Sequence, residues 1–143
     1  MATAQRNDPF LNYRFAIEID NVIQGFAEAS GLQSEVQTED FREGGLNTYA
    51  YKIVKGAAYQ NLTLKRGMAT GTELWDWHRN AIRGKVERKT VRLILRDHQG
   101  NDVRRWGFKE AFPIKWVGPD LKAGENSIAF ETLEIAHHGY EDI

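Results

Sequence analysis

Alternating apolar and polar residues dominate the chain and predict a protein built mainly from β-strands. The first such run, residues 13–20, carries large apolar side chains at every second position: Tyr13, Phe15, Ile17 and Ile19. This spacing is expected of a half-buried strand. Asp20 and Asn21 follow, and both tolerate the positive φ of a two-residue hairpin turn. Residues 22–29 are therefore expected to return beside the first strand, up to a break at Ser30–Gly31.

Several later segments have the same period of two. Residues 35–42 form an unusually polar run, whose one face holds Glu35, Gln37 and Glu39 and must therefore meet water. Residues 61–68 and 89–97 predict two more strands with leucine and valine on their inner faces. A turn over residues 98–101 leads the second of these back into residues 103–110.

The last third of the chain holds the longest strand signal. Its even positions carry five large apolar side chains, which one continuous strand would place on a single face: Trp106, Phe108, Phe112, Ile114 and Trp116. A turn-rich segment, residues 117–126, separates this run from a final strand. There, Ile128 and Phe130 are out of phase with Leu133 and Ile135. Either a bulge lies near residues 131–132, or the two ends of the strand pack against different partners.

One segment has a helical period. Residues 72–83 carry an apolar stripe at i, i+3, i+4, i+7 and i+8: Leu74, Trp77, His78, Ala81 and Ile82. Thr70 and Glu73 have capping-box spacing, and Gly84 supplies a C-terminal stop. The opposite face, which is expected to point outward, holds Asp76, Arg79, Asn80 and Arg83.

Residues 43–60 stand apart from these regular segments. Glycine-containing stretches at both ends enclose several aromatic and β-branched residues. So long a connection inside a compact domain usually has a function. We expect a protruding arm that packs on something outside its own domain; the alternative is a hairpin folded onto its own core.

Composition bounds the fold and the function. The 143 residues suffice for one domain with its own core, residues 1–143, with an N-terminal arm at residues 1–9. The net charge is −1, and there is no cysteine, hence no disulfide or thiolate metal site. The N-terminus lacks the apolar region of a signal peptide, and no apolar run approaches the roughly 20 residues of a membrane span, so we expect a cytoplasmic product without a membrane anchor. The expected fold is a mainly β, antiparallel barrel or sandwich with one helix.

A search for reaction chemistry finds no catalytic set. No serine lies in a G-x-S-x-G context, and no phosphate-binding glycine motif occurs. His78 is expected to be a satisfied core histidine, whereas His137 and His138 are adjacent and would point to opposite faces of a strand. We therefore expect no enzyme activity, no cofactor and no metal site.

A basic run suggests one alternative function. Five basic residues lie between Lys85 and Arg96, and Arg104 and Arg105 lie in the following strand. On a barrel surface they could follow a phosphate backbone, which would make the chain a soluble nucleic-acid-binding module. The other interpretation is a solvated strand face paired with acids from neighbouring strands.

The chain resembles the phage tail-tube family, which includes the inner-tube proteins of contractile injection systems. The resemblance runs from about residue 8 to residue 141. It lies in the order and spacing of short motifs: Asp8-Pro9-Phe10, Tyr13-Arg14-Phe15, Gly25-Phe26, Ser30-Gly31-Leu32, Phe41-Arg42-Glu43-Gly44-Gly45, Pro113-Ile114-Lys115-Trp116, Gly118-Pro119, Leu121, Asn126, Glu131-Thr132-Leu133-Glu134 and His137-His138-Gly139.

The resemblance implies a structural subunit that forms hexameric rings, which stack into a hollow tube conveying DNA or protein effectors. It implies contacts with a sheath protein and with baseplate or initiator and terminator proteins, assembly in a bacterial cytoplasm, and incorporation into a phage tail or a released phage-like particle. Candidate lumen-facing residues are Gln24, Glu28, Glu35, Gln37, Glu39, Arg92 and Arg96. Candidate inter-subunit or inter-ring residues are Gly44, Gly45, Tyr49, Tyr51, Ile53 and Val54. The outward helix residues Asp76, Arg79, Asn80 and Arg83 are candidate sheath contacts.

Overall fold

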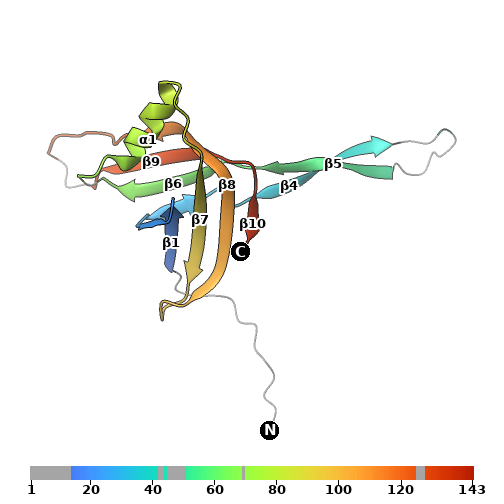
Figure 1. Ribbon diagram of the computed structural model, residues 1–143, viewed down its shortest axis with the longest axis horizontal. Coiled ribbons are helices and arrows are strands. Elements are labelled where there is room, and N and C mark those ends of the chain that lie inside the picture. The colour runs from blue at the N-terminus through green and yellow to red at the C-terminus, as the bar shows by residue number, and fades with distance from the viewer. Residues whose placement is uncertain (1–13, 42–43, 45–50, 69, 125–127) are drawn as a thin grey trace, which may run out of the picture.

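A computed structural model describes residues 14–41, 44, 51–68, 70–124 and 128–143 (Figure 1). Most of this part of the chain is β-structure, with a single helix. The elements are β1 (Arg14–Ile19), β2 (Val22–Gln24), β3 (Glu28–Ser30), β4 (Ser34–Phe41), β5 (Tyr51–Tyr59), β6 (Leu62–Gly67), α1 (Glu73–Ile82), β7 (Lys89–Arg96), β8 (Asp102–Val117), β9 (Phe130–Ala136) and β10 (Tyr140–Asp142). The mainly β, antiparallel fold with one helix is confirmed.

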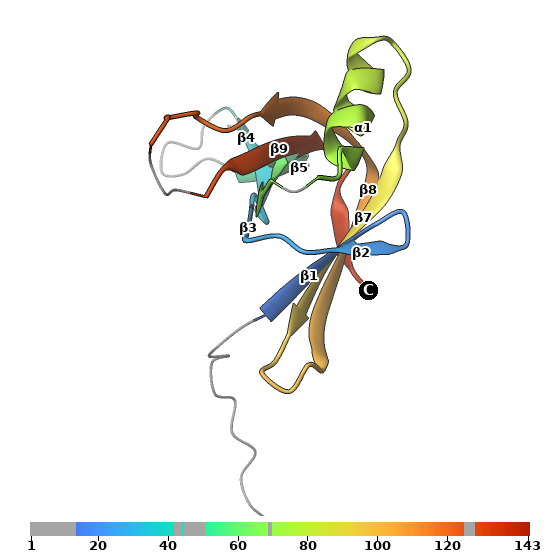
Figure 2. The ribbon, with the colours of Figure 1, turned by 90° about the vertical axis from the view of Figure 1, so that its left-hand side faces the viewer.

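Eight strands form one antiparallel sheet in the order β2-β1-β7-β8-β9-β6-β3, with β10 also paired to β8. The long strand β8 pairs with different strands along its length: residues 102–111 pair with β7, and residues 112–117 pair with β9. The sheet therefore folds into two layers that share β8 (Figure 2). The first layer holds β2, β1, β7, β10 and the start of β8. The second holds β3, β6, β9 and the end of β8.

Strand β8 changes layers through two irregularities in its pairing. The first lies at Glu110, whose φ is +51°, and the second between Pro113 and Lys115. Each shifts the alternation of inward and outward side chains. The five apolar side chains at even positions therefore do not share one face, contrary to the sequence expectation: Phe108 is fully buried, whereas Ile114 is 44% exposed.

The core lies between the two layers and is closed by α1. Its buried residues are Ile17, Ile19, Leu62, Leu64, Leu74, Trp77, Val91, Leu93, Phe108, Ala111, Leu133 and Ile135. Leu62 and Leu64, the inward leucines expected for residues 61–68, are among them and are fully buried. Trp77 is anchored by its indole Nε1–H, which donates to the Glu87 carbonyl at 2.7 Å.

The helix has the expected extent but differs from the prediction at both ends. Thr72 is the N-cap, and its hydroxyl lies 3.0 Å from Asp76 Oδ2, so the predicted capping box from Thr70 to Glu73 is wrong. Ile82 is 66% exposed, so the last position of the predicted apolar stripe lies outside the core. Trp75, which the stripe omitted, packs against Trp116 with ring centroids 5.0 Å apart.

The first hairpin confirms the expected turn and shortens the expected return strand. Asp20 and Asn21 have φ values of +53° and +65°, and β2 follows them. The return strand ends at Gln24, however, and residues 28–30 pair with β6 instead. A single strand over residues 22–29 is therefore wrong, because the chain crosses there from the first layer to the second.

The final strand resolves the phase slip seen in the sequence. Strand β9 begins at Phe130, and its register with β6 runs without a shift, so no bulge lies at residues 131–132. Ile128 lies before the strand and is 72% exposed. Leu133 and Ile135 face the core, and Phe130 lies on the outer side with the Lys65 ammonium 4.8 Å from its ring centroid.

Strands β4 and β5 pair with each other in a separate sheet and extend away from the body as a two-stranded ribbon (Figure 1). All eight residues of β4 are exposed. The arm expected over residues 43–60 is therefore not a loop throughout, because residues 51–59 are one strand of this ribbon. The protruding element begins at Ser34, nine residues earlier than the sequence indicated.

Candidate assembly surface

The ribbon formed by β4 and β5 has two faces of different chemistry. One face carries carboxylates beside apolar groups and contains no lysine or arginine: Glu35, Gln37, Glu39, Phe41, Tyr51, Ile53, Gly56 and Ala58. We call this the acidic face. The opposite face holds Ser34, Val36, Thr38, Asp40, Lys52, Val54, Ala57 and Tyr59. Lys55 lies at the register shift between Gln37 and Thr38 and has no partner in the ladder.

Apolar side chains on the ribbon are left open to solvent. Phe41, Ile53 and Val54 are 49%, 48% and 67% exposed. A two-stranded ribbon in water is at best marginally stable without a third surface to cover it. The ribbon is therefore suited to burial against another molecule. Among the inter-subunit candidates, Tyr51, Ile53 and Val54 lie on the ribbon, Gly44 is exposed, and Gly45 and Tyr49 lie outside the described residues.

The structure does not bring the seven lumen-facing candidates together. Glu35, Gln37 and Glu39 share the acidic face of the ribbon. Glu28 lies on the exposed edge strand β3 of the second layer. Gln24 points toward the core side, where its Oε1 accepts a hydrogen bond from Arg66 at 3.1 Å.

Arg92 and Arg96 lie on the outer face of the first layer, in a hollow lined by charged side chains of both signs. The core separates them from the outer face of the second layer, so these two surfaces point in different directions.

Ion pairs occupy the hollow of the first layer. Arg92 lies 3.0 Å from Glu18, Arg96 lies 3.0 Å from Asp102, and Arg105 also bonds Asp102. Hydrogen bonds from Arg105 and then Arg96 hold the pKa of Asp102 below its ordinary value. Four of the seven basic residues are therefore paired with acids, Arg92, Arg96 and Arg105 here and Arg104 with Asp142, and the nucleic-acid alternative is left unsupported.

The outer face of the second layer carries mainly polar and charged side chains, with Phe130 beside Lys65. Cross-strand pairing sets Glu28, Lys65 and Thr132 in one row across β3, β6 and β9. A second row holds Ser30, Thr63 and Glu134. This is a wettable wall over three adjacent strands.

The helix shows only part of its predicted outward face to solvent. Arg83 is exposed, whereas Asp76, Arg79 and Asn80 are half-buried. Arg79 and Asp76 form an ion pair at 3.1 Å, and Arg79 Nε is buried without a hydrogen-bond partner among the described residues. His78 Nδ1 is also buried without one, so the expected satisfied core histidine is wrong.

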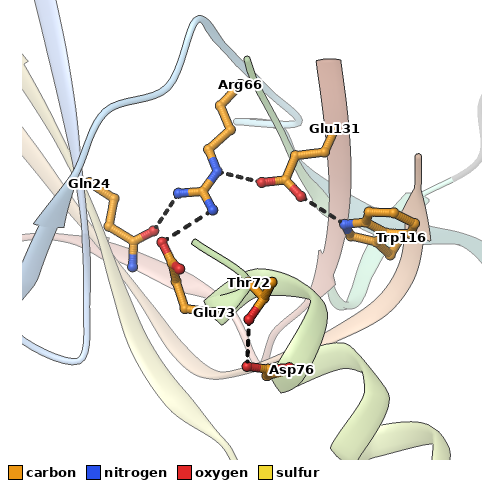
Figure 3. A network of polar contacts seen from close by, with 7 residues as sticks. All are labelled: Gln24, Arg66, Thr72, Glu73, Asp76, Trp116 and Glu131. Atoms are coloured by element: carbon orange, nitrogen blue, oxygen red, sulfur yellow. Dashed lines mark hydrogen bonds and ion pairs between the residues drawn. The ribbon is translucent and has the colours of Figure 1, made fainter. Parts of the chain in front are cut away.

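A buried polar network, not anticipated from the sequence, links the sheet to the helix (Figure 3). Arg66 Nε donates to Glu131 at 2.6 Å, and the other Glu131 oxygen accepts from Trp116 Nε1 at 3.1 Å. Arg66 also bonds Glu73 at the start of α1 and Gln24 in β2. Glu131 is 4% exposed, so this is a charge held in the core by its partners. Charged residues in alternating strands are usually solvated, and no local pattern marks Arg66 and Glu131 as partners.

The described residues contain no cluster of three or more histidine, cysteine or acidic side chains that could hold a metal ion. Within the same residues, no helix is both long and apolar enough to span a membrane. His137 Nε2 lies 2.8 Å from the Gln60 carbonyl oxygen, and its Nδ1 accepts from the Gly139 amide at 3.0 Å. His137 therefore has a structural role at the end of β9.

Comparison with known proteins identifies the family. A family model described as T4-like virus tail tube protein gp19 matches residues 11–141. The chain belongs to this family. It is thus a tail tube protein of the kind found in contractile tails and injection systems, and the resemblance seen in the sequence is confirmed. A search of curated protein sequences found no significant match.

Solved structures share the tail tube fold over nearly the whole chain. A chain from the anti-feeding prophage cap, described as a tube-terminating cap, is 26% identical, with a TM-score of 0.88 and coverage of 99% of this chain and 95% of that one. A chain from the sheath–tube complex of the PVC extracellular contractile injection system in its extended state is 27% identical, with a TM-score of 0.81 and coverage of 96% and 94%. Hcp1 from Flavobacterium johnsoniae shares the fold at 13% identity, with a TM-score of 0.63 and coverage of 90% and 93%.

Proposed function

We propose that the chain is a single-domain structural subunit, without catalytic activity, whose six copies form a ring and whose rings stack into a hollow tube. The observation that carries the proposal is the ribbon of β4 and β5, which projects from the body with both faces exposed. A monomer gains little from such an element, whereas an assembly can cover it. Membership of the tail tube family and the similarity to Hcp1 support the same architecture.

Strand edges give the ring a second source of stability. Strands β2 and β3 end the eight-stranded sheet, and each presents unpaired backbone groups along one edge. Open edges promote pairing with other chains, and closure of a ring through neighbours satisfies them. Cyclic symmetry lets one heterologous contact repeat around the ring. The ring number of six comes from the family, not from any residue of this chain.

We further propose that the outer face of the second layer, with Glu28, lines the lumen together with Glu35 and Gln37 at the body end of the ribbon. Polar and charged side chains on β3, β6 and β9 suit a wet channel wall. The ion-paired face containing Arg92 and Arg96 then lies elsewhere on the subunit. This division follows from the core that separates the two layers.

The outer wall of the tube is proposed to contact a sheath through the helix, with Arg83 as its most accessible candidate and Asp76, Arg79 and Asn80 beside it. Similar chains occur in structures described as a baseplate, a sheath–tube terminator and a sheath–tube complex. Equivalent partners are proposed here. The tube would assemble in the bacterial cytoplasm and convey DNA or protein effectors.

Electron microscopy of the purified protein, alone and with initiating baseplate components, tests the assembly. We expect rings or rods with a central channel. Cysteine-free parent protein allows a matched labelling test of the lumen, with Thr63→Cys on the proposed wall and Thr90→Cys in the first-layer hollow. In rods, a small maleimide should label both cysteine variants. A large polymer-linked maleimide should label Thr90→Cys but not Thr63→Cys, because it is too large to enter the channel. The reverse protection would contradict the lumen assignment, and absence of rings and rods with initiator present would contradict the assembly.

A further inference from the structure

Two segments that carry exposed apolar side chains, the ribbon and the turn after β8, lie at opposite ends of the long axis of the molecule (Figure 1). The ribbon projects at one end. At the other end, four large apolar side chains around the turn after β8 are exposed: Met68 44%, Val117 45%, Leu121 85% and Ile128 72%. We call this second surface the loop end. The Met68 amide donates a hydrogen bond to the Ala129 carbonyl at 2.8 Å, which joins the end of β6 to the segment just before β9.

The outer half of the acidic face provides a surface of matching character. It contains Phe41, Tyr51 and Ile53, with Glu39 directly opposite Ile53 in the ladder. The half nearer the body instead holds Glu35, Gln37, Gly56 and Ala58. The apolar character of this face is therefore concentrated away from the body, where it is available to another molecule.

Charge distinguishes the two surfaces and makes them complementary. Glu35 and Glu39 are the charged residues that the ladder places on the acidic face, while Lys55 lies at the register shift. The hollow at the loop end is lined by two lysines, Lys65 and Lys122, and by one acid, Asp120, among its described residues. Neither Glu39 nor Lys122 forms an ion pair with another described residue. Opposite charge at the rim of two apolar surfaces favours one orientation over others.

From this complementarity we propose that the outer half of the acidic face of one copy docks on the loop end of a second copy in the neighbouring ring. The contact is heterologous, so it can repeat from one copy to the next, and we place it between rings because the ribbon and the loop end lie at opposite ends of the subunit. Phe41 and Ile53 cover Val117, Leu121 and Ile128, while Glu39 pairs with Lys122. This inference rests on the proposed stacking of rings and names the surface that receives the ribbon.

Disulfide cross-linking tests the contact directly, because the parent chain has no cysteine. Ile53→Cys protein and Leu121→Cys protein are mixed, assembled into rods and oxidised. We expect a covalent dimer on a non-reducing gel. Val54→Cys is the matched control, since Val54 is the neighbouring exposed residue on the opposite face of the ribbon. A yield with Val54→Cys equal to that with Ile53→Cys, or no dimer from rods, would overturn the docking.

A charge exchange provides an independent readout in uncross-linked protein. Glu39→Lys and Lys122→Glu should each raise the protein concentration needed for rods about two- to fivefold, the range expected for one exposed ion pair. The double variant should return it toward the parent value. Additive defects would overturn the pairing of Glu39 with Lys122. Rods without the selective cross-link reject only the docking, whereas absence of rings and rods with initiator present rejects the proposed function as well.

Discussion

At the scale of single residues, the Arg66–Glu131 pair is the most consequential feature of the core. Loss of one partner from a buried ion pair typically costs about 3–5 kcal/mol, because the remaining charge is left without compensation. We predict that Glu131→Ala lowers the free energy of unfolding by about this amount, because it removes the partner of Arg66 and leaves Trp116 Nε1 without its hydrogen-bond acceptor. Urea unfolding measures it. Glu134→Ala, on the outer side of the same strand, is the control and should change stability by less than about 1 kcal/mol.

Glu73 makes the network sensitive to acid. Its own backbone N–H at the start of α1, followed by Arg66, holds the pKa of the Glu73 carboxyl below its ordinary value of 4.5. Because the folded pKa is the lower one, ionised Glu73 stabilises the fold at neutral pH, and this contribution is lost as pH falls below about 4.5. We predict that Glu73→Gln is less stable than the parent at pH 7 and that the difference shrinks toward pH 3. A constant difference across this range would contradict the prediction.

The two faces of α1 should respond very differently to truncation. Trp77 is 4% exposed and hydrogen-bonded, so Trp77→Ala should cost about 3–5 kcal/mol. Arg79→Ala removes only a half-exposed i,i+3 ion pair, worth about 0.2–0.5 kcal/mol. Thermal melts of the two variants at one concentration check the prediction. Equal melting temperatures would show that the helix is oriented otherwise.

At the scale of elements, the bend in β8 depends on one unusual backbone conformation. Glu110 has a φ of +51°, which a β-branched side chain adopts only with strain. We predict that Glu110→Val destabilises the fold by about 1–2 kcal/mol, whereas Glu110→Gly is close to neutral. Chemical denaturation of the two variants distinguishes them. Equal losses would point to the side chain, not the backbone, as the important feature at this position.

The ribbon should serve assembly more than folding. Replacement of residues 38–55 by Asn-Gly keeps the pairs from Ser34–Tyr59 to Gln37–Gly56 and closes them with a favoured hairpin turn. The variant should be folded, soluble and unable to stack. Circular dichroism and electron microscopy check both halves of the prediction. A variant that forms normal rods, or one that fails to fold, would show that the ribbon is not an inter-subunit element.

Sequence patterns predicted those elements whose signal is local. The amphipathic period specified β1 and the extent of α1, and Asp20–Asn21 specified their turn. The phase of β8 could not be predicted, because it depends on the backbone at Glu110, where no glycine marks the bulge. The partnership of Arg66 with Glu131 was equally hidden, because 65 positions separate them and only the fold brings them together.

At the scale of the whole molecule, the acidic face and the loop end could not be predicted from local sequence patterns either. The run of Glu35, Gln37 and Glu39 was recognised as a wet strand face. Its ladder partners Ile53, Gly56 and Ala58 became visible only with the register of β5. The structure thereby divides one apparently polar face into a polar inner half and an apolar outer half. The family resemblance suggested the assembly, and the register of β5 suggests the surface that we propose for it.

The assembled tube should resist salt. Its proposed contacts are strand edges and apolar side chains such as Phe41, Ile53 and Leu121, and neither type is weakened by screening. At about 1 M salt the Debye length falls to about 3 Å, which removes most attraction between exposed charges. We predict that rods persist from 0.05 to about 1 M sodium chloride, and that Ile53→Ser with Leu121→Ser disassembles at all of these concentrations. Negative-stain imaging and sedimentation at matched protein concentration measure this. Rods that dissolve into subunits as salt rises would show that charge, not apolar and backbone contact, holds the tube together.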